Sequence, residues 1–379
     1  MPISNEDLVK IQELRSLVKD KLTPYYDTDF NLLRWLQGHN YNVEMIKPKL
    51  ENHLFLRKWD WDLDNMADAM RADPIQEHWR NGLTGESGVI PNVIINLEQT
   101  GKNDWWGMLA THPMNQILKS RVQDLEIMLA RVMELEKKTG EQAHIMYVMD
   151  LGGLAWDRKL PGLLTGPLSA LSAFMADHYV ELIHSFVLVN VPTFISAVWT
   201  IAHPLLPERT KKKVVILGGN WKSEILKYAN PSVLPSFWNQ EGEDGPFKYH
   251  LKRCIPYPSE KFYKDQLPSE AETLTIPAGK SDSIDIYIDE DEDLKWEIHS
   301  DGTFNFMVYY VEDPRETTAV EDLAPATPYF AKVPGPTCCP LRERMKCHKP
   351  GIYRFIFTND AWFYTVKITH LLERATRNS

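Results

Sequence analysis

A long uncharged stretch constrains the fold of this chain more than any other feature. Between Glu181 and Glu208 the sequence has no Asp, Glu, Lys or Arg. About 25 mostly apolar residues in a row would by themselves suggest a membrane-spanning helix. Residues 186–189, however, form a short β-branched and aromatic run typical of a buried strand, and Asn190 and Pro192 then interrupt the chain. We therefore expect a strand, a turn and an apolar helix.

The expected helix runs from Thr193, whose hydroxyl is suited to capping it, to His203, just before a proline. It is apolar nearly all round. Such a helix is either buried on every side or meets lipid. Two interpretations stay open from these residues: a helix in the middle of a core, or a helix that walls an apolar cavity.

The residues around this helix resemble the lipid-exchange core of the Sec14-like, or CRAL-TRIO, proteins. In that family a Glu begins the strand, a strand-turn-helix follows, and a Lys precedes an apolar strand that ends in Leu-Gly. Glu181, Lys213 and the segment Val214–Lys222 match this pattern. The resemblance implies that the helix is a gate over a lipid pocket. It also implies the following gate or cavity residues: Phe194, Ala197, Val198 and Ile201.

The same resemblance implies that Glu181 and Lys213 contact a lipid headgroup, with Thr210 as a third member. A buried Lys can pair with a phosphate, and a carboxylate can accept hydrogen bonds from hydroxyls. The alternative is a structural salt bridge between Glu181 and Lys213. The basic run 209–213 is either a solvated turn or a contact for anionic membrane.

Residues 1–70 have helical periodicity and are expected to form an N-terminal helical bundle. Within them, residues 32–44 resemble the N-terminal motif of the CRAL-TRIO family, in which Arg-Ala-Arg follows the Leu-Leu-Arg phrase. Gln37, Gly38 and His39 stand at those positions here. The second Arg of the family contributes to phosphoinositide recognition, whereas His39 is mostly neutral near pH 7. His39 therefore remains a candidate ligand contact, but a weaker one.

Residues 71–250 alternate strand and helix patterns, which predicts an α/β domain. Family members that hold phosphatidylcholine carry Ser and Thr in the strand before the Asp-Leu-x-Gly turn. The matching positions are Ile145 and Tyr147. The resemblance therefore argues against a choline site and for a more hydrophobic ligand.

Residues 251–379 change character. A group of prolines predicts a linker, and short alternating strands then predict a β-sandwich. The prolines are Pro256, Pro258 and Pro268. Residues 294–310 and 350–368 resemble the GOLD domain, so the chain has the domain order of the animal Sec14-like subgroup.

Composition and motifs narrow the function further. The net charge of −10 argues against a nucleic-acid partner. The first residues contain no apolar leader, and four Cys fit a reducing cytosol. The group Cys338, Cys339, Cys347 and His348 lacks zinc-ligand spacing, and the acidic stretch 282–293 lacks the pattern of a calcium loop. No catalytic signature is found. We therefore expect no metal, no cofactor and no enzyme.

The sequence thus predicts a multidomain lipid-binding or transfer protein. It would carry one phospholipid or isoprenoid-like molecule, touch membranes transiently, and be cytoplasmic, with the Golgi as one candidate membrane. The sandwich would supply protein partners. The alternative is a membrane-trafficking adaptor in which the GOLD-like domain recruits partners and the lipid pocket is regulatory or vestigial. The identity of the ligand stays open.

Overall fold

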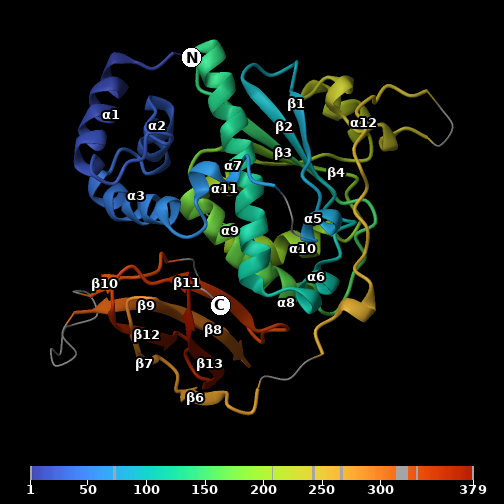
Figure 1. The fold of residues 1–379 in the computed structure, drawn as a ribbon. Coiled ribbons are helices and arrows are strands. Elements are labelled where there is room, and N and C mark those ends of the chain that lie inside the picture. Colours follow the sequence, from blue (N-terminus) through green and yellow to red (C-terminus); the bar gives the residue numbers. More distant parts are fainter. Residues whose placement is uncertain are drawn as a thin grey trace.

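The N-terminal helices form a layer of their own beside the rest of the molecule (Figure 1). The computed structural model describes residues 2–70, 74–206, 208–240, 244–264, 268–312, 323–329 and 332–377. Helices α1 (Asn5–Val18), α2 (Asp29–Gly38), α3 (Val43–Lys58) and α4 (Leu63–Met66) open the chain. Ser4, Thr28 and Asn42 cap the first three, because each side-chain oxygen accepts a hydrogen bond from a backbone N–H of the first turn. The predicted helical bundle is therefore present.

The central layer is a five-stranded sheet in the order β1-β2-β3-β4-β5. Its strands are β1 (Leu83–Glu86), β2 (Val93–Glu98), β3 (His144–Asp150), β4 (Ile183–Val189) and β5 (Val214–Ile216). Only β1 is antiparallel to its neighbour. The short helix α5 (Ile75–His78) precedes β1, and the short helix α6 (Trp105–Thr111) follows β2. The long α7 (Met114–Thr139) connects β2 to β3 and ends at Gly140, which has φ of +70°.

The remaining helices cover the two faces of this sheet. Helices α8 (Leu160–Thr165) and α9 (Pro167–His178) connect β3 to β4, whereas α10 (Ile195–Ala202) and α11 (Glu208–Lys212) connect β4 to β5. Successive side chains of a strand point to opposite faces. On one face, Met146 and Val148 pack with Trp221 and Ile225 of the segment that begins with α12 (Trp221–Glu224). The other face of the sheet carries Tyr147 and faces α8, α9 and α10.

The C-terminal part consists of two four-stranded antiparallel sheets that face one another. One has the order β10-β9-β12-β7 and the other β11-β8-β13-β6. Trp296 packs edge-on against Phe306 and Phe355 of the opposite sheet. The strands are β6 (Glu272–Ile276), β7 (Lys280–Ile288), β8 (Glu292–Ser300), β9 (Asn305–Val311), β10 (Ala324–Pro325), β11 (Leu341–Lys346), β12 (Gly351–Asn359) and β13 (Val366–Thr376). The sandwich follows the predicted pattern, and its GOLD-like character stays a prediction.

The sandwich packs against both of the other layers (Figure 1). The side chain of Asn115, on α7, donates a hydrogen bond of 2.7 Å to the carbonyl of Arg342. Near the end of α3, Asp60 accepts one of 2.8 Å from the Lys346 N–H. These contacts come from separate parts of the chain, so the sandwich has a defined orientation.

The segment around Pro256 and Pro258 is more ordered than the predicted linker. The Tyr257 ring stacks on His78 with centroids 3.5 Å apart, and the Tyr257 N–H donates a 3.0 Å hydrogen bond to Asp104. Proline spacing indicates only where regular structure stops. Tertiary contacts then fix this segment against the α/β layer.

Candidate functional site

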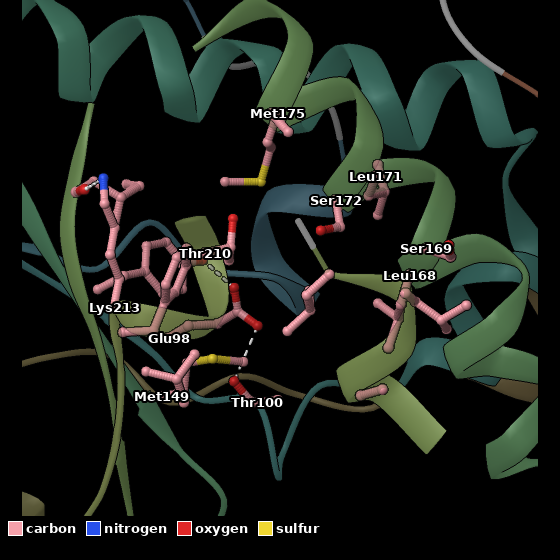
Figure 2. A pocket seen from close by; sticks show the side chains of 18 of the residues that line it. Glu98, Thr100, Met149, Leu168, Ser169, Leu171, Ser172, Met175, Thr210 and Lys213 are labelled. Atoms are coloured by element: carbon pink, nitrogen blue, oxygen red, sulfur yellow. Dashed lines mark hydrogen bonds between the residues drawn. The ribbon is translucent and has the colours of Figure 1, made fainter. Parts of the chain in front are cut away.

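A cavity of about 510 Å³ lies between the sheet and helices α8, α9 and α10. Figure 2 shows Ser172 and Met175 of α9 on one side of it, opposite Glu98 and Met149 of the sheet. Most lining side chains are apolar, and five of them are leucines of α8 and α9: Leu160, Leu163, Leu164, Leu168 and Leu171. A cavity of this size and lining is typical of a site for a small apolar molecule.

One face of α9 builds one wall of the cavity. Leu168, Ser172 and Met175 recur at spacings of four and three residues, so they share one helix face and line the cavity. Phe174 and His178 lie on another face and are buried. The small Ser172 side chain leaves room that a larger residue would fill.

Helix α10 closes the cavity with a different face from the one expected. It runs from Ile195 to Ala202 and continues as a 3₁₀ turn, His203–Leu205. No side chain caps it, so the predicted capping role of Thr193 is wrong. Val198 is the only buried residue of the helix. The central-core interpretation is therefore wrong as well.

Of the four gate or cavity residues expected from the sequence, one lines the cavity and three do not. Val198 lines the cavity, together with Ile195, Trp199 and Ala202, which were not expected. Of the other three, Ala197 is exposed, and Phe194 and Ile201 are half-buried outside the lining. The Phe194 ring packs edge-on against Trp156, 5.7 Å away. A helix that is apolar all round gives no sequence signal for its inward face.

Three charged side chains meet at one end of the cavity, and we call Glu181, Arg209 and Lys213 the outer cluster. Glu181 accepts a 3.0 Å hydrogen bond from Arg209 and one of 2.8 Å from Lys213. The side chains are 19%, 37% and 23% exposed, respectively. The cluster carries two positive charges and one negative charge, so it favours a negatively charged group. Glu181 also has a left-handed backbone, with φ of +53°, which is uncommon for this residue type.

The predicted pair Glu181 and Lys213 is therefore brought together, and Arg209 is the member that the interpretation of the sequence missed. Arg209 also donates hydrogen bonds to the Gln37 carbonyl (2.6 Å) and the Asn40 side chain (3.1 Å) at the end of α2. It thus brings a guanidinium to the same turn of the chain as His39. Its place in the basic run 209–213 was the available signal.

His39 and Thr210 both line the cavity. The His39 ring stacks on Trp35 at 5.6 Å, and burial lowers the pKa of His39 below its usual value, so the ring is neutral. The Thr210 carbonyl accepts a 3.0 Å hydrogen bond from the Lys213 N–H. Thr210 therefore helps to position the backbone from which the Lys213 side chain extends (Figure 2).

A second polar group lies deeper, and we call Glu98, Thr100, Arg121 and Tyr147 the inner cluster. The Tyr147 hydroxyl donates to Glu98 and accepts a 2.5 Å hydrogen bond from Arg121. Thr100 donates a 3.0 Å hydrogen bond to Glu98 (Figure 2). Glu98, Arg121 and Tyr147 are each less than 8% exposed, and burial raises the pKa of Tyr147 well above its usual value. The phenol is therefore a permanent donor.

The inner cluster was not predicted, because its members come from β2, α7 and β3. Glu98 at the carboxyl end of a buried strand was the available signal. Ile145 is fully buried in the main core and does not line the cavity, so it does not set the polarity of the ligand site as expected.

Within the described residues, no helix combines the length and apolarity that crossing a membrane requires. In the same residues, no group of three or more His, Cys, Asp or Glu is placed to hold a metal ion.

Comparison with known proteins agrees with this geometry. Residues 91–239 match the CRAL/TRIO domain, residues 258–379 match the F28H7.8-like C-terminal domain, and residues 3–66 match a domain of unknown function. The strand-and-helix layer around the cavity is therefore a CRAL-TRIO domain. The chain therefore contains a CRAL/TRIO domain over residues 91–239.

Two curated relatives and one solved structure are similar to this chain. The CRAL-TRIO domain-containing protein F28H7.8 of Caenorhabditis elegans is 27% identical over 376 residues, which cover 95% of this chain and 88% of that protein. The phosphatidylinositol/phosphatidylcholine transfer protein SFH9 of Arabidopsis thaliana is 24% identical over 58% of this chain and 38% of its own. The crystal structure of Sfh5 superposes with a TM-score of 0.52 at 15% identity, covering 68% of this chain and 95% of Sfh5. The last likeness concerns the fold alone.

Proposed function

We propose that this protein binds one lipid molecule in the cavity and exchanges it with membranes. The observation that carries the proposal is the combination of an apolar cavity of about 510 Å³ with a charged outer cluster at one end. An amphiphile has the same division between an apolar body and a polar head. The transfer activity in the name of SFH9 belongs to that protein, and the similarity supports the proposal.

The outer cluster is proposed to bind a phosphate-bearing head. Arg209 and Lys213 are both held by Glu181, so their charges point to one place. A phosphate oxygen that accepts from these two donors forms charge-assisted hydrogen bonds, which are about twice as strong as neutral ones. In the inner cluster, Glu98 and Arg121 balance each other through Tyr147. The inner end therefore accommodates neutral groups, and the charged head lies outward.

Helix α10 is proposed to be the gate. Moving a lipid tail from the cavity into water costs about 0.8 kcal/mol of free energy for each CH₂. The lipid therefore leaves the cavity only where a membrane takes up the tail. The backbone is irregular on both sides of the helix: Asn190 with φ of +54° and Pro192 precede it, and the 3₁₀ turn His203–Leu205 follows. The half-exposed faces of α10 are apolar enough to meet the membrane during opening.

The proposal assumes three domains, 1–70, 71–250 and 251–379, of which the last is a GOLD-like sandwich. It also assumes a cytoplasmic protein with transient membrane association.

Native mass spectrometry of the protein from a eukaryotic host tests the head-binding part. The wild-type protein is expected to retain a phosphate-bearing lipid, and Arg209→Ala and Lys213→Ala are expected to lose at least about 80% of it, since each removes a charge-assisted hydrogen bond of about 1.5–3 kcal/mol. Lys212→Ala is the matched control, because Lys212 is an exposed lysine of the same turn and does not line the cavity. A neutral lipid retained equally by all variants would contradict the assignment of the head.

A pair of tryptophan substitutions tests the cavity. Ser172→Trp places a large ring in the cavity and is expected to abolish lipid retention and transfer between vesicles. Ala173→Trp is the control, because Ala173 follows Ser172 on α9 but is exposed. Lipid retention by Ser172→Trp equal to that of the wild type would overturn the assignment of the ligand to this cavity.

A further inference from the structure

The loop between β12 and β13 exposes three aromatic residues in succession. Trp362 is 94% exposed, Phe363 88% and Tyr364 41%. Single exposed apolar residues are common on protein surfaces. Two adjacent large rings that are almost entirely in water are not, and contiguous apolar exposure marks an interaction site.

The conformation of this aromatic loop, residues 360–364, is fixed by the buried side chain of Asn359. Its amide nitrogen donates hydrogen bonds of 3.0 Å to the Ile276 carbonyl and 2.8 Å to the Tyr364 carbonyl. Its oxygen accepts one of 2.9 Å from the Ala361 N–H. The fully buried Asn359 therefore holds both ends of the loop, and the rings project from a firm base.

The loop lies at the end of the sandwich that is closest to the helices over the cavity. Asp360 forms an ion pair of 3.0 Å with Lys332. Pro334, two residues after Lys332, lies next to the junction of α8 and α9. A Cβ added to Gly166 at that junction would be 3.6 Å from the Pro334 side chain. Figure 1 likewise shows α8 beside this end of the sandwich. On the α8 side, Trp156 is half exposed and contacts Phe194, next to α10.

We propose that the aromatic loop inserts into the interfacial layer of a lipid bilayer and thereby anchors the sandwich to membranes. Trp and Tyr concentrate at membrane interfaces because their rings are apolar and their N–H or O–H groups stay hydrated. The three rings occupy a projecting loop rather than a groove, which suits a soft, unstructured partner. The orientation of α10 toward the same membrane rests on the proposed function, whereas the insertion does not.

Charge around the loop indicates which membrane would bind. Lys332 is neutralised by Asp360, and Asp301 lies beside the exposed Lys367, because its side chain accepts a 2.8 Å hydrogen bond from the Lys367 backbone N–H. The loop therefore carries no large positive excess. Binding is expected to depend on burial of the rings and to need no anionic lipid.

Sedimentation with vesicles of pure phosphatidylcholine tests the inference on the full chain. The double variant Trp362→Ser/Phe363→Ser is expected to lower the vesicle partition coefficient at least about tenfold. Tyr287→Ser is the matched control: Tyr287 is 55% exposed but pairs with Ile352, at the opposite end of β7 from Lys280 and the loop. Equal partitioning of the double variant and the wild type would overturn the inference, and so would an equal loss in the control.

Fluorescence quenching by brominated lipids gives a second, independent measurement. Trp362→Phe keeps an apolar ring at the tip, so it is expected to bind vesicles like the wild type while losing the quenched component of the tryptophan emission. Quenching that persists in this variant would place the inserted tryptophan elsewhere. Lipid retained in the cavity, measured by native mass spectrometry, is expected to be unchanged in both loop variants. Failure of loop insertion and failure of cavity binding are thus distinguishable.

Discussion

Replacement of Arg57 by methionine is expected to destabilise the contact between the N-terminal helices and the CRAL-TRIO domain. Arg57 on α3 donates hydrogen bonds of 3.0 and 3.1 Å to the two carboxylate oxygens of Glu126 on α7. Both side chains are 0% exposed. Asp64 also accepts a 2.7 Å hydrogen bond from Arg57. The guanidinium is therefore the main partner of a carboxylate that has no access to water.

The size of the expected loss of stability depends on the hydrogen bonds that Glu126 keeps after the substitution. In Arg57→Met, its only remaining hydrogen bond among those described is the 2.8 Å bond from the Tyr179 hydroxyl. An uncompensated buried charge of this kind costs about 3–5 kcal/mol. That is a large share of the roughly 5–15 kcal/mol by which domains are stable. In contrast, Arg57→Met/Glu126→Leu replaces the whole pair by apolar groups and is expected to recover at least about half of the loss.

Urea unfolding at pH 7 measures both effects, with tryptophan fluorescence as the probe. Lys58→Met is the control, since Lys58 is the exposed neighbour of Arg57 on α3. A loss below about 1 kcal/mol in Arg57→Met would refute the reasoning. A double variant whose loss equals the sum of the two single losses would refute it as well, because no coupling would exist between the two residues.

Three further predictions concern single positions. Burial lowers the pKa of His178 to about 4, so between about pH 6.5 and pH 4 the unfolded chain binds a proton at this residue that the folded chain does not. The free energy of unfolding therefore falls by about 1.4 kcal/mol for each pH unit in that range because of this residue. Urea unfolding at pH 5 and pH 7 should show a smaller pH dependence in His178→Gln. Asp104→Ala removes the cap of α6 and the acceptor of the Tyr257 N–H, which should cost about 1–2 kcal/mol and speed proteolysis of residues 251–262; cleavage at the wild-type rate would contradict it. Gly38→Ala would put a Cβ 1.9 Å from Val180, so we expect a loss of about 1–3 kcal/mol by thermal unfolding, and an unchanged midpoint would argue against this close approach.

The elements around the cavity were predictable because their signals are local. The apolar run that became β3, the long periodic pattern of α7 and the alternating strands of the sandwich follow from side-chain periodicity over a few neighbouring residues. The salt bridge between Glu181 and Lys213, which was the alternative to a headgroup contact, is present at 2.8 Å. Their role in binding a headgroup stays a proposal.

The sequence by itself thus determined the class of fold, the order of the elements and the existence of an apolar helix next to a charged pair. Only the tertiary structure decided which face of α10 lines the cavity, that Arg209 completes the outer cluster, and that Glu98, Arg121 and Tyr147 meet inside. It also decided that the aromatic segment between β12 and β13 is an exposed loop. The physical reason is range: periodicity and turn chemistry act between near neighbours, whereas these sites form between segments that come together only when the sheet and its helices pack.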